Sequence, residues 1–234
     1  MTTPDRTPFG AVLFDMDGLL VDSEPLWHVA EIEVLGNLGV PISVDEARAT
    51  KGMFANEVVA FWHSRYPWDG PSVDEVAVMV TDRAGDLIED RGELLPGALA
   101  VIDLVEEQGM GRAVASSSHY RLIDRVLAHF DLAHRFALRH SAEDEPFGKP
   151  HPGVFLTAAA KLGVPPRHCL VLEDSPAGVL AAKAASMTAV AVPADTERGR
   201  AEIALADAVL DSLEALDAVM LAELSGGSGR HPLG

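Results

Sequence analysis

Short apolar runs alternate with helical patterns along most of this chain, and that order limits the possible folds more than any other feature. The runs are rich in branched side chains and too short for helices, which is typical of buried strands in a parallel sheet. We predict strands at residues 11–14, 112–115, 136–138, 170–172 and 188–192, and helices at 98–108, 120–130, 154–162 and 177–185. The alternation predicts an α/β fold in which helices cover both faces of a parallel sheet.

One interval, residues 24–91, breaks the alternation because it shows helical periodicity without a strand pattern. It contains two capping boxes, in which Ser43 and Ser72 each precede a glutamate by three residues. We therefore predict an inserted helical cap subdomain at 24–91. The core that receives it is expected to comprise residues 9–23 and 92–224.

Composition narrows the classes of partner. The chain has 36 acidic and 18 basic residues, a formal net charge of −18, and such a surface repels phosphate backbones. We therefore expect no nucleic-acid partner. The start of the chain lacks a signal-peptide pattern and no apolar stretch reaches membrane-spanning length, so we expect a cytoplasmic protein without a membrane partner. A monomer is the working expectation, and the Gly/Ser-rich segment 225–234 is expected to be disordered.

Polar side chains follow four of the predicted strands, at the point where each strand ends. They are Asp15 and Asp17 after the first strand, Ser116 and Ser117 after the second, Lys149 after the third, and Glu173 and Asp174 after the fourth. Ligands of open parallel sheets bind just beyond the carboxyl ends of the strands. The sequence therefore predicts one site that gathers these residues at a single edge of the sheet.

The charges at this edge predict a metal ion. Four carboxylates face one lysine, and two like charges about 4 Å apart cost roughly 4 kcal/mol at an effective dielectric constant near 20. Such a cluster requires a cation or protonated carboxyls. Because every donor is a hard oxygen, we predict Mg²⁺, with Asp15, Asp17, Glu173 and Asp174 as the metal-binding residues.

These residue types also suit phosphoryl transfer to a carboxylate. Asp15 would act as the nucleophile, and Asp17 would protonate the leaving alcohol and then activate water. Ser116 and Ser117, at the start of a helix, would bind phosphate oxygens, and Lys149 would neutralise the transferring group. The expected partner is therefore a small phosphorylated metabolite.

The order of these motifs resembles the haloacid dehalogenase-like superfamily. Residues 14–24 (FDMDGLLVDSE) are similar to its first motif, and Ser116, Lys149 in Gly-Lys-Pro-His-Pro, and residues 172–175 are similar to the second, third and fourth. The resemblance extends from about residue 9 to residue 216. Residues 23–27 (SEPLW) and 66–71 (YPWDGP) make it strongest for sugar-phosphate phosphatases of the hexitol phosphatase and 2-deoxyglucose-6-phosphate phosphatase type, which are related to β-phosphoglucomutase.

This resemblance implies a Rossmann-like core, a mobile helical cap, Mg²⁺ dependence and a phosphoaspartate at Asp15. It also implies that the backbone carbonyl of Asp17 contributes to the metal site. The expected function is hydrolysis of small sugar or sugar-alcohol phosphate monoesters. Within the cap, Trp27 is expected near the substrate, and Lys51 with Gly52 is a further candidate for selecting the sugar.

Asp17 argues against halide chemistry, because dehalogenases lack the second aspartate. Two alternatives to a phosphatase remain open at this stage. β-Phosphoglucomutases typically carry a histidine where this chain has Trp27, with His28 one position away, which disfavours a hexose phosphate mutase without excluding it. The other alternative is a non-catalytic metal-binding module.

Overall fold

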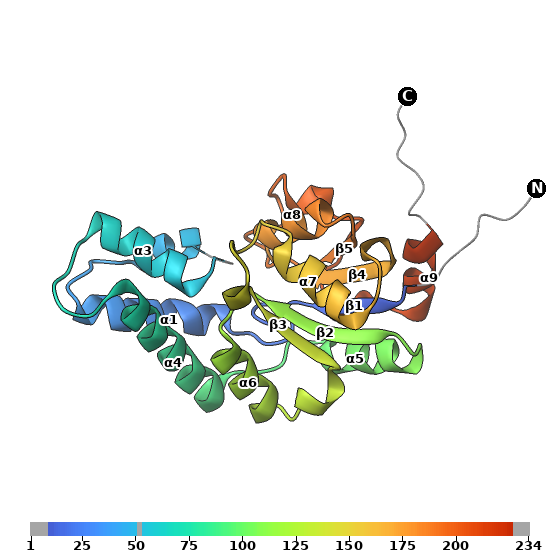
Figure 1. Ribbon diagram of the computed structural model, residues 1–234, viewed down its shortest axis with the longest axis horizontal. Helices are drawn as coiled ribbons and strands as arrows, with labels where there is room; N and C mark the ends of the chain where they lie inside the picture. The colour runs from blue at the N-terminus through green and yellow to red at the C-terminus, as the bar shows by residue number, and fades with distance from the viewer. Residues whose placement is uncertain (1–8, 51–52, 227–234) are drawn as a thin grey trace, which may run out of the picture.

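The computed structural model describes residues 9–50 and 53–226, and a six-stranded parallel sheet forms its centre (Figure 1). The strand order is β3-β2-β1-β4-β5-β6, and each neighbouring pair is parallel. The strands are β1 (Ala11–Phe14), β2 (Gly111–Ser116), β3 (Leu138–Ser141), β4 (Cys169–Glu173), β5 (Thr188–Ala191) and β6 (Ala208–Val209). Since all strands point the same way, the loops that follow them meet at one edge of the sheet.

Helices cover both faces of this sheet, which confirms the predicted α/β fold. Side chains alternate between the faces along each strand, so Val12 and Phe14 of β1 join one buried cluster while Ala11 and Leu13 join another. The first cluster includes α5 (Ala98–Glu107) and α6 (Tyr120–His129), and the second includes α7 (Gly153–Leu162) and α8 (Pro176–Ala184). The last described helix is α9 (Ala218–Gly226), and none of the described helices is long and apolar enough to cross a membrane.

Two local predictions were wrong and one strand was missed. The third strand spans Leu138–Ser141 rather than 136–138, because its polar residues, including the buried His140, gave no apolar run. Strand β6 has two residues and is too short to produce a pattern. Helix α9 extends through Gly226, so the first two residues of the segment 225–234 are helical, and its residues 227–234 lie outside the described part.

The interval between β1 and α5 folds into helices that lie to one side of the sheet (Figure 1). They are α1 (Glu24–Asn37), α2 (Val44–Ala47), α3 (Ala55–Arg65) and α4 (Val73–Arg91). Both predicted capping boxes are present, because Ser43 and Ser72 exchange hydrogen bonds with Glu46 and Glu75. Trp62 of α3 is almost fully buried among these helices, here called the cap helices, and it belongs to the same apolar cluster as Val12 and Phe14 of the sheet.

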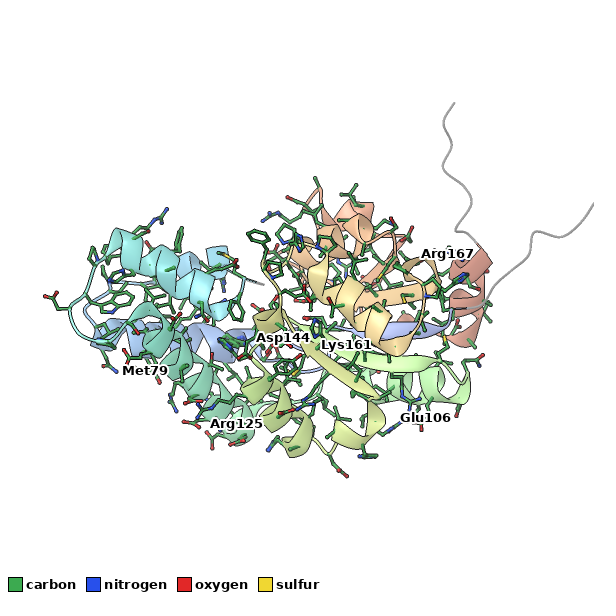
Figure 2. The ribbon with its side chains drawn as sticks, in the orientation of Figure 1. Met79, Glu106, Arg125, Asp144, Lys161 and Arg167 are labelled. Atoms are coloured by element: carbon green, nitrogen blue, oxygen red, sulfur yellow. The ribbon has the colours of Figure 1, made fainter. Side chains whose placement is uncertain are left out.

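The cap helices are joined to the core at several places, two of which fix how the chain enters and how α4 lies. Where the chain leaves and re-enters the core it pairs with itself: the Asp22 amide donates to the Glu93 carbonyl and the Leu95 amide to the Leu20 carbonyl, each at 2.9 Å. Farther out, α4 packs along α6, where Figure 2 marks Arg125. The Arg125 guanidinium donates to both carboxylate oxygens of Glu89, at 3.0 and 2.6 Å.

Candidate active site

Three carboxylates and one ammonium group meet at the carboxyl edge of the sheet. Asp15 follows β1, Glu173 ends β4 and Asp174 comes next, and one oxygen from each lies within 4.8 Å of the others. Lys149 reaches them from the loop between β3 and α7, and its Nζ lies 2.7 Å from Asp15 Oδ1 and 2.5 Å from Glu173 Oε1. All four residues are buried. The predicted convergence of these strand-end residues is therefore present.

Glu173 holds Lys149 from a fixed position. Its Oε2 accepts hydrogen bonds from the Ser175 amide and the Ser175 hydroxyl, each at 2.9 Å, while Oε1 accepts from Lys149. The backbone of Gly178 lies so close that a Cβ there would come within 1.8 Å of Glu173 Oε1. Both oxygens of Glu173 thus have protein partners, and the absence of a side chain at position 178 makes room for them.

The charge states of the pair Asp15–Lys149 follow from their surroundings. Burial alone favours a neutral amine, but the carboxylates of Asp15 and Glu173 outweigh it and raise the pKa of Lys149, so the lysine is charged at neutral pH. Burial raises the pKa of Asp15 well above its ordinary value, and the charge of Lys149 opposes that shift. A further positive charge near Asp15 would therefore favour its ionised form and lower its pKa.

The residues present fit a divalent cation. Asp15, Glu173, Asp174 and Lys149 together carry a net charge of two minus when ionised, which one divalent ion balances. The donors are carboxylate oxygens, the ligands that Mg²⁺ prefers. Gly18, with a φ of +76°, allows the close approach, because a Cβ there would lie 2.4 Å from Asp174 Oδ2. This buried acidic cluster could therefore hold a metal ion.

Asp17 is held by three donors from three parts of the chain. Ser23 Oγ and Trp27 Nε1 donate to its Oδ1 at 2.7 and 2.8 Å, and Ser118 Oγ donates to Oδ2 at 2.7 Å. Trp27 belongs to α1 of the cap helices, whereas Ser118 follows β2. The orientation of this carboxylate therefore depends on both the core and the cap helices.

The serines after β2 form a turn at the same edge. Ser116 Oγ accepts a hydrogen bond from the Ser118 amide at 3.0 Å, and Ser141 donates to the Ser118 carbonyl at 2.6 Å. Among the described residues, the buried Ser117 Oγ has no hydrogen-bond partner. A buried hydroxyl without a protein partner is suited to an oxygen of a ligand.

An open cavity lies over this edge, of about 710 Å³ when the solvent at its mouth is included, and the core and the cap helices both line it. The core contributes Asp15, Asp17, Ser116, Ser117, Ser118, Lys149, Asp174 and Ser175. From α1 come Glu24, Trp27, His28 and Glu31, which share one helix face by their spacing. Glu31 is buried, and burial raises its pKa to about 8, although Thr50 opposes the shift.

The raised pKa of Glu31 predicts a measurable pH dependence of stability. The unfolded chain releases this proton near pH 4.5 and the folded chain near pH 8, so the folded state binds more protons between these values and stability falls as pH rises. Relative to Glu31→Gln, we expect the wild-type free energy of unfolding to drop by about 3–5 kcal/mol at most across this window. Urea unfolding of both proteins from pH 4 to 9 checks this. The difference between their free energies of unfolding isolates Glu31, because the other ionisable groups of the cavity are present in both proteins. A constant difference would contradict it.

Sequence reasoning located the residues at the strand ends but missed several partners. Ser23 and Ser118 hold Asp17, and Glu31 lines the cavity, yet none of the three was predicted. Trp27 was expected near the substrate, and it lines the cavity. Lys51 and Gly52, the other cap candidates, lie outside the described residues.

Comparison with known proteins gives a consistent result. The model of the family described as haloacid dehalogenase-like hydrolase matches residues 9–186. The chain is 46% identical over 219 residues to hexitol phosphatase B of Escherichia coli (strain K12), covering 93% of this chain and 98% of that protein. A mutant of CbbY from Rhodobacter sphaeroides, solved with xylulose-(1,5)bisphosphate, superposes with a TM-score of 0.81 at 27% identity, over 89% of this chain and 96% of that one.

The β-phosphoglucomutase of Clostridium difficile has a TM-score of 0.80 at 24% identity, covering 93% of this chain and 97% of that one, and so shares the fold. The family match covers most of the chain, including β1 to β4 and the loops that carry the acidic cluster. The hexitol phosphatase match adds high identity over nearly full length. This protein therefore belongs to the haloacid dehalogenase-like hydrolase family.

Proposed function

We propose that the protein is a Mg²⁺-dependent phosphatase that hydrolyses small sugar or sugar-alcohol phosphate monoesters through an aspartyl-phosphate at Asp15. The main support is the buried cluster of Asp15, Glu173, Asp174 and Lys149 at the base of a cavity that the core and the cap helices both line. The similarity to hexitol phosphatase B supports the substrate class.

In the proposed mechanism, the phosphate of the substrate binds between Lys149 and the serine turn. Lys149 neutralises its charge, and Ser117 donates a hydrogen bond to one of its oxygens. An oxygen of Asp15 attacks phosphorus, a new bond forms between them, and the bond from phosphorus to the alcohol oxygen breaks. Asp17 gives its proton to that oxygen, so the product leaves as a neutral alcohol.

The second half of the proposed reaction regenerates the enzyme. Asp17, now ionised, removes a proton from water, and the resulting hydroxide attacks phosphorus. The bond between phosphorus and Asp15 breaks, and inorganic phosphate is released. When bound by Asp15, Asp174 and the Asp17 carbonyl, a magnesium ion would screen the repulsion between carboxylate and phosphate. Glu173 then contributes by holding Lys149.

A panel of phosphate esters tests this function. Hexitol, hexose and phenyl phosphates are incubated with the protein in Mg²⁺ or in excess EDTA, and inorganic phosphate is measured. We expect release in Mg²⁺ and its loss in EDTA. Equal release under both conditions would contradict metal dependence, and no release from any ester would favour a metal-binding module. Conversion of β-glucose 1-phosphate to glucose 6-phosphate without phosphate release would instead identify a mutase.

Trp27 offers a test of how Asp17 is oriented. The Trp27→Phe variant keeps an aromatic ring but removes the donor that lies 2.8 Å from Asp17 Oδ1. We expect kcat to fall about tenfold, which corresponds to one hydrogen bond of about 1.4 kcal/mol, with KM nearly unchanged.

The matched control is Trp68→Phe, which removes an indole donor to the Pro71 carbonyl, at 2.9 Å, outside the cavity. It should retain wild-type kcat. Unchanged kcat in Trp27→Phe, or an equal loss in both variants, would show that the Trp27 hydrogen bond does not serve catalysis.

We also propose that residues 24–91 act as a cap that closes over the substrate, inserted in the core formed by 9–23 and 92–224. The support is that α1 lines the cavity while the chain on either side of the cap helices pairs at a single place. Closure would exclude bulk water from the cavity, and the hydrogen bond that Trp27 donates to Asp17 at 2.8 Å would hold the cap against the core.

A further inference from the structure

Glu31 is a buried acid on the cap side of the cavity that no step of the proposed mechanism uses. It lies on α1, one helical turn beyond Trp27, and its exposed fraction is 7%. In the part of the chain that the structure describes, its Oε2 has no hydrogen-bond partner, although it is buried. The same side chain lines the cavity that contains Asp15 and Lys149.

A purely structural role does not account for this side chain. A buried polar group without a partner destabilises the fold, and an apolar residue of similar size would pack there at lower cost. Thr50 hydrogen-bonds to the Glu31 carboxyl group, but its hydroxyl also donates to the Ala47 carbonyl at 2.8 Å, and Oε2 keeps no partner among the described residues. Lys149, the lysine of this cavity, is already paired with Asp15 and Glu173. The position therefore favours a partner that enters with the ligand.

We propose that Glu31 recognises the substrate by forming hydrogen bonds with a hydroxyl group of its organic part, away from the phosphate. This inference rests on the proposed function, because it assumes that the phosphate binds at Lys149 on the core side. The partner chemistry follows from the site. A carboxyl group in its neutral form donates one hydrogen bond and accepts others, and a hydroxyl group does the same. A second phosphate at this position would meet an acid, and Lys149, the lysine among the described lining residues, is already paired with Asp15 and Glu173.

The opposite walls of the cavity would then have different tasks. The core side binds the phosphate, which every substrate shares, and Glu31 on the cap side distinguishes a polyol from an apolar alcohol. Apolar side chains of the cap helices, including Val58 and Val80, line the same cavity. A hydroxyl group that enters this wall needs a polar partner, and Glu31 supplies one.

Kinetics of two variants on two substrates test the proposal. Glu31→Gln retains both donor and acceptor capacity, and Glu31→Leu removes both. The substrates are a hexitol phosphate and phenyl phosphate, which lacks hydroxyl groups, and both are assayed in Mg²⁺. For Glu31→Leu we expect kcat/KM on the hexitol phosphate to fall about 10- to 100-fold, with phenyl phosphate changed less than about twofold. Glu31→Gln should recover most of the loss.

Thermal unfolding separates recognition from structural support. Because Glu31→Leu removes an unpartnered buried polar group, its melting temperature should equal or exceed that of the wild type. The matched control is Glu33→Leu, the same change on the same helix where Glu33 pairs with Arg83 at 2.6 Å outside the cavity. It should not alter the ratio of the two kcat/KM values.

The outcomes are distinct. Equal losses on both substrates with a lower melting temperature would assign Glu31 a structural role, and no loss on either would remove it from recognition; both overturn the inference. Equal kcat/KM of the wild type on both substrates would also overturn it while leaving the phosphatase function intact. A wild-type protein that releases phosphate from neither substrate would instead overturn the proposed function on which it rests.

Discussion

The Asp15→Asn variant is expected to release no phosphate from any ester while remaining folded. The amide is nearly the same size as the carboxylate but cannot form the phosphoryl bond, so kcat should fall by at least about 10⁴-fold. Lys149 keeps its partner Glu173 at 2.5 Å. Burial already disfavours an ionised Asp15, so the melting temperature without Mg²⁺ should match or exceed that of the wild type. Phosphate release and thermal unfolding are the two measurements.

Asp22→Asn provides the control for this change. Asp22 lies in the same sequence motif, is exposed and is absent from the residues that line the 710 Å³ cavity. It should retain wild-type turnover. Substantial phosphate release by Asp15→Asn would contradict the assignment of the nucleophile, and equal losses in the two variants would point to a general effect on folding.

The second large effect is expected from Lys149→Met. This change leaves three buried carboxylates without the ammonium group that lies 2.7 Å from Asp15 and 2.5 Å from Glu173. Removing one partner of a buried ion pair costs about 3–5 kcal/mol, so the melting temperature should fall by roughly 6–20 °C. Turnover should fall by about 10³-fold or more, because the buried positive charge that would neutralise the transferring phosphoryl group is lost. A Mg²⁺ ion bound as proposed would neutralise the same cluster, so Mg²⁺ should raise the melting temperature of the variant more than that of the wild type.

Lys183→Met is the matched control, since Lys183 pairs with Asp207 at 2.6 Å with both side chains about a third exposed. Solvent-exposed pairs contribute less than about 1 kcal/mol, so both stability and turnover should change little. If the two lysine variants lost the same stability, the buried cluster would not depend on Lys149 in the way described here.

The sheet and the acidic cluster could be predicted because both leave local signals. Buried parallel strands produce apolar runs, and residues such as Asp15 and Glu173 follow those runs directly. Strand β3 was misplaced because it carries Arg139, His140 and Ser141 and so has no apolar run. The buried His140 pairs with Glu145 at 2.7 Å. A polar group with a tertiary partner cannot be told from an exposed one in the sequence.

The cap side of the site was harder to predict for the same reason. Glu24, Trp27, His28 and Glu31 recur at helical spacing, and such a polar stripe is most often a solvated face. Here it lines the cavity instead, because the core lies opposite to it. Glu173 could bind a metal or support Lys149, and the sequence does not distinguish the two roles. The structure does, because Lys149 and Ser175 contact its two carboxylate oxygens.

The paired backbone segments at Leu20–Asp22 and Glu93–Leu95 have a consequence for how such a protein can diverge. Because the exit and the return of the chain are hydrogen-bonded neighbours, the intervening helices can be lengthened, shortened or exchanged without moving a strand of the sheet. Under the proposed function, the residues that bind the phosphate and those that select the alcohol would then lie on separable stretches of polypeptide. Chimeras joined at these paired segments are therefore a direct way to transfer a substrate preference from one relative to another.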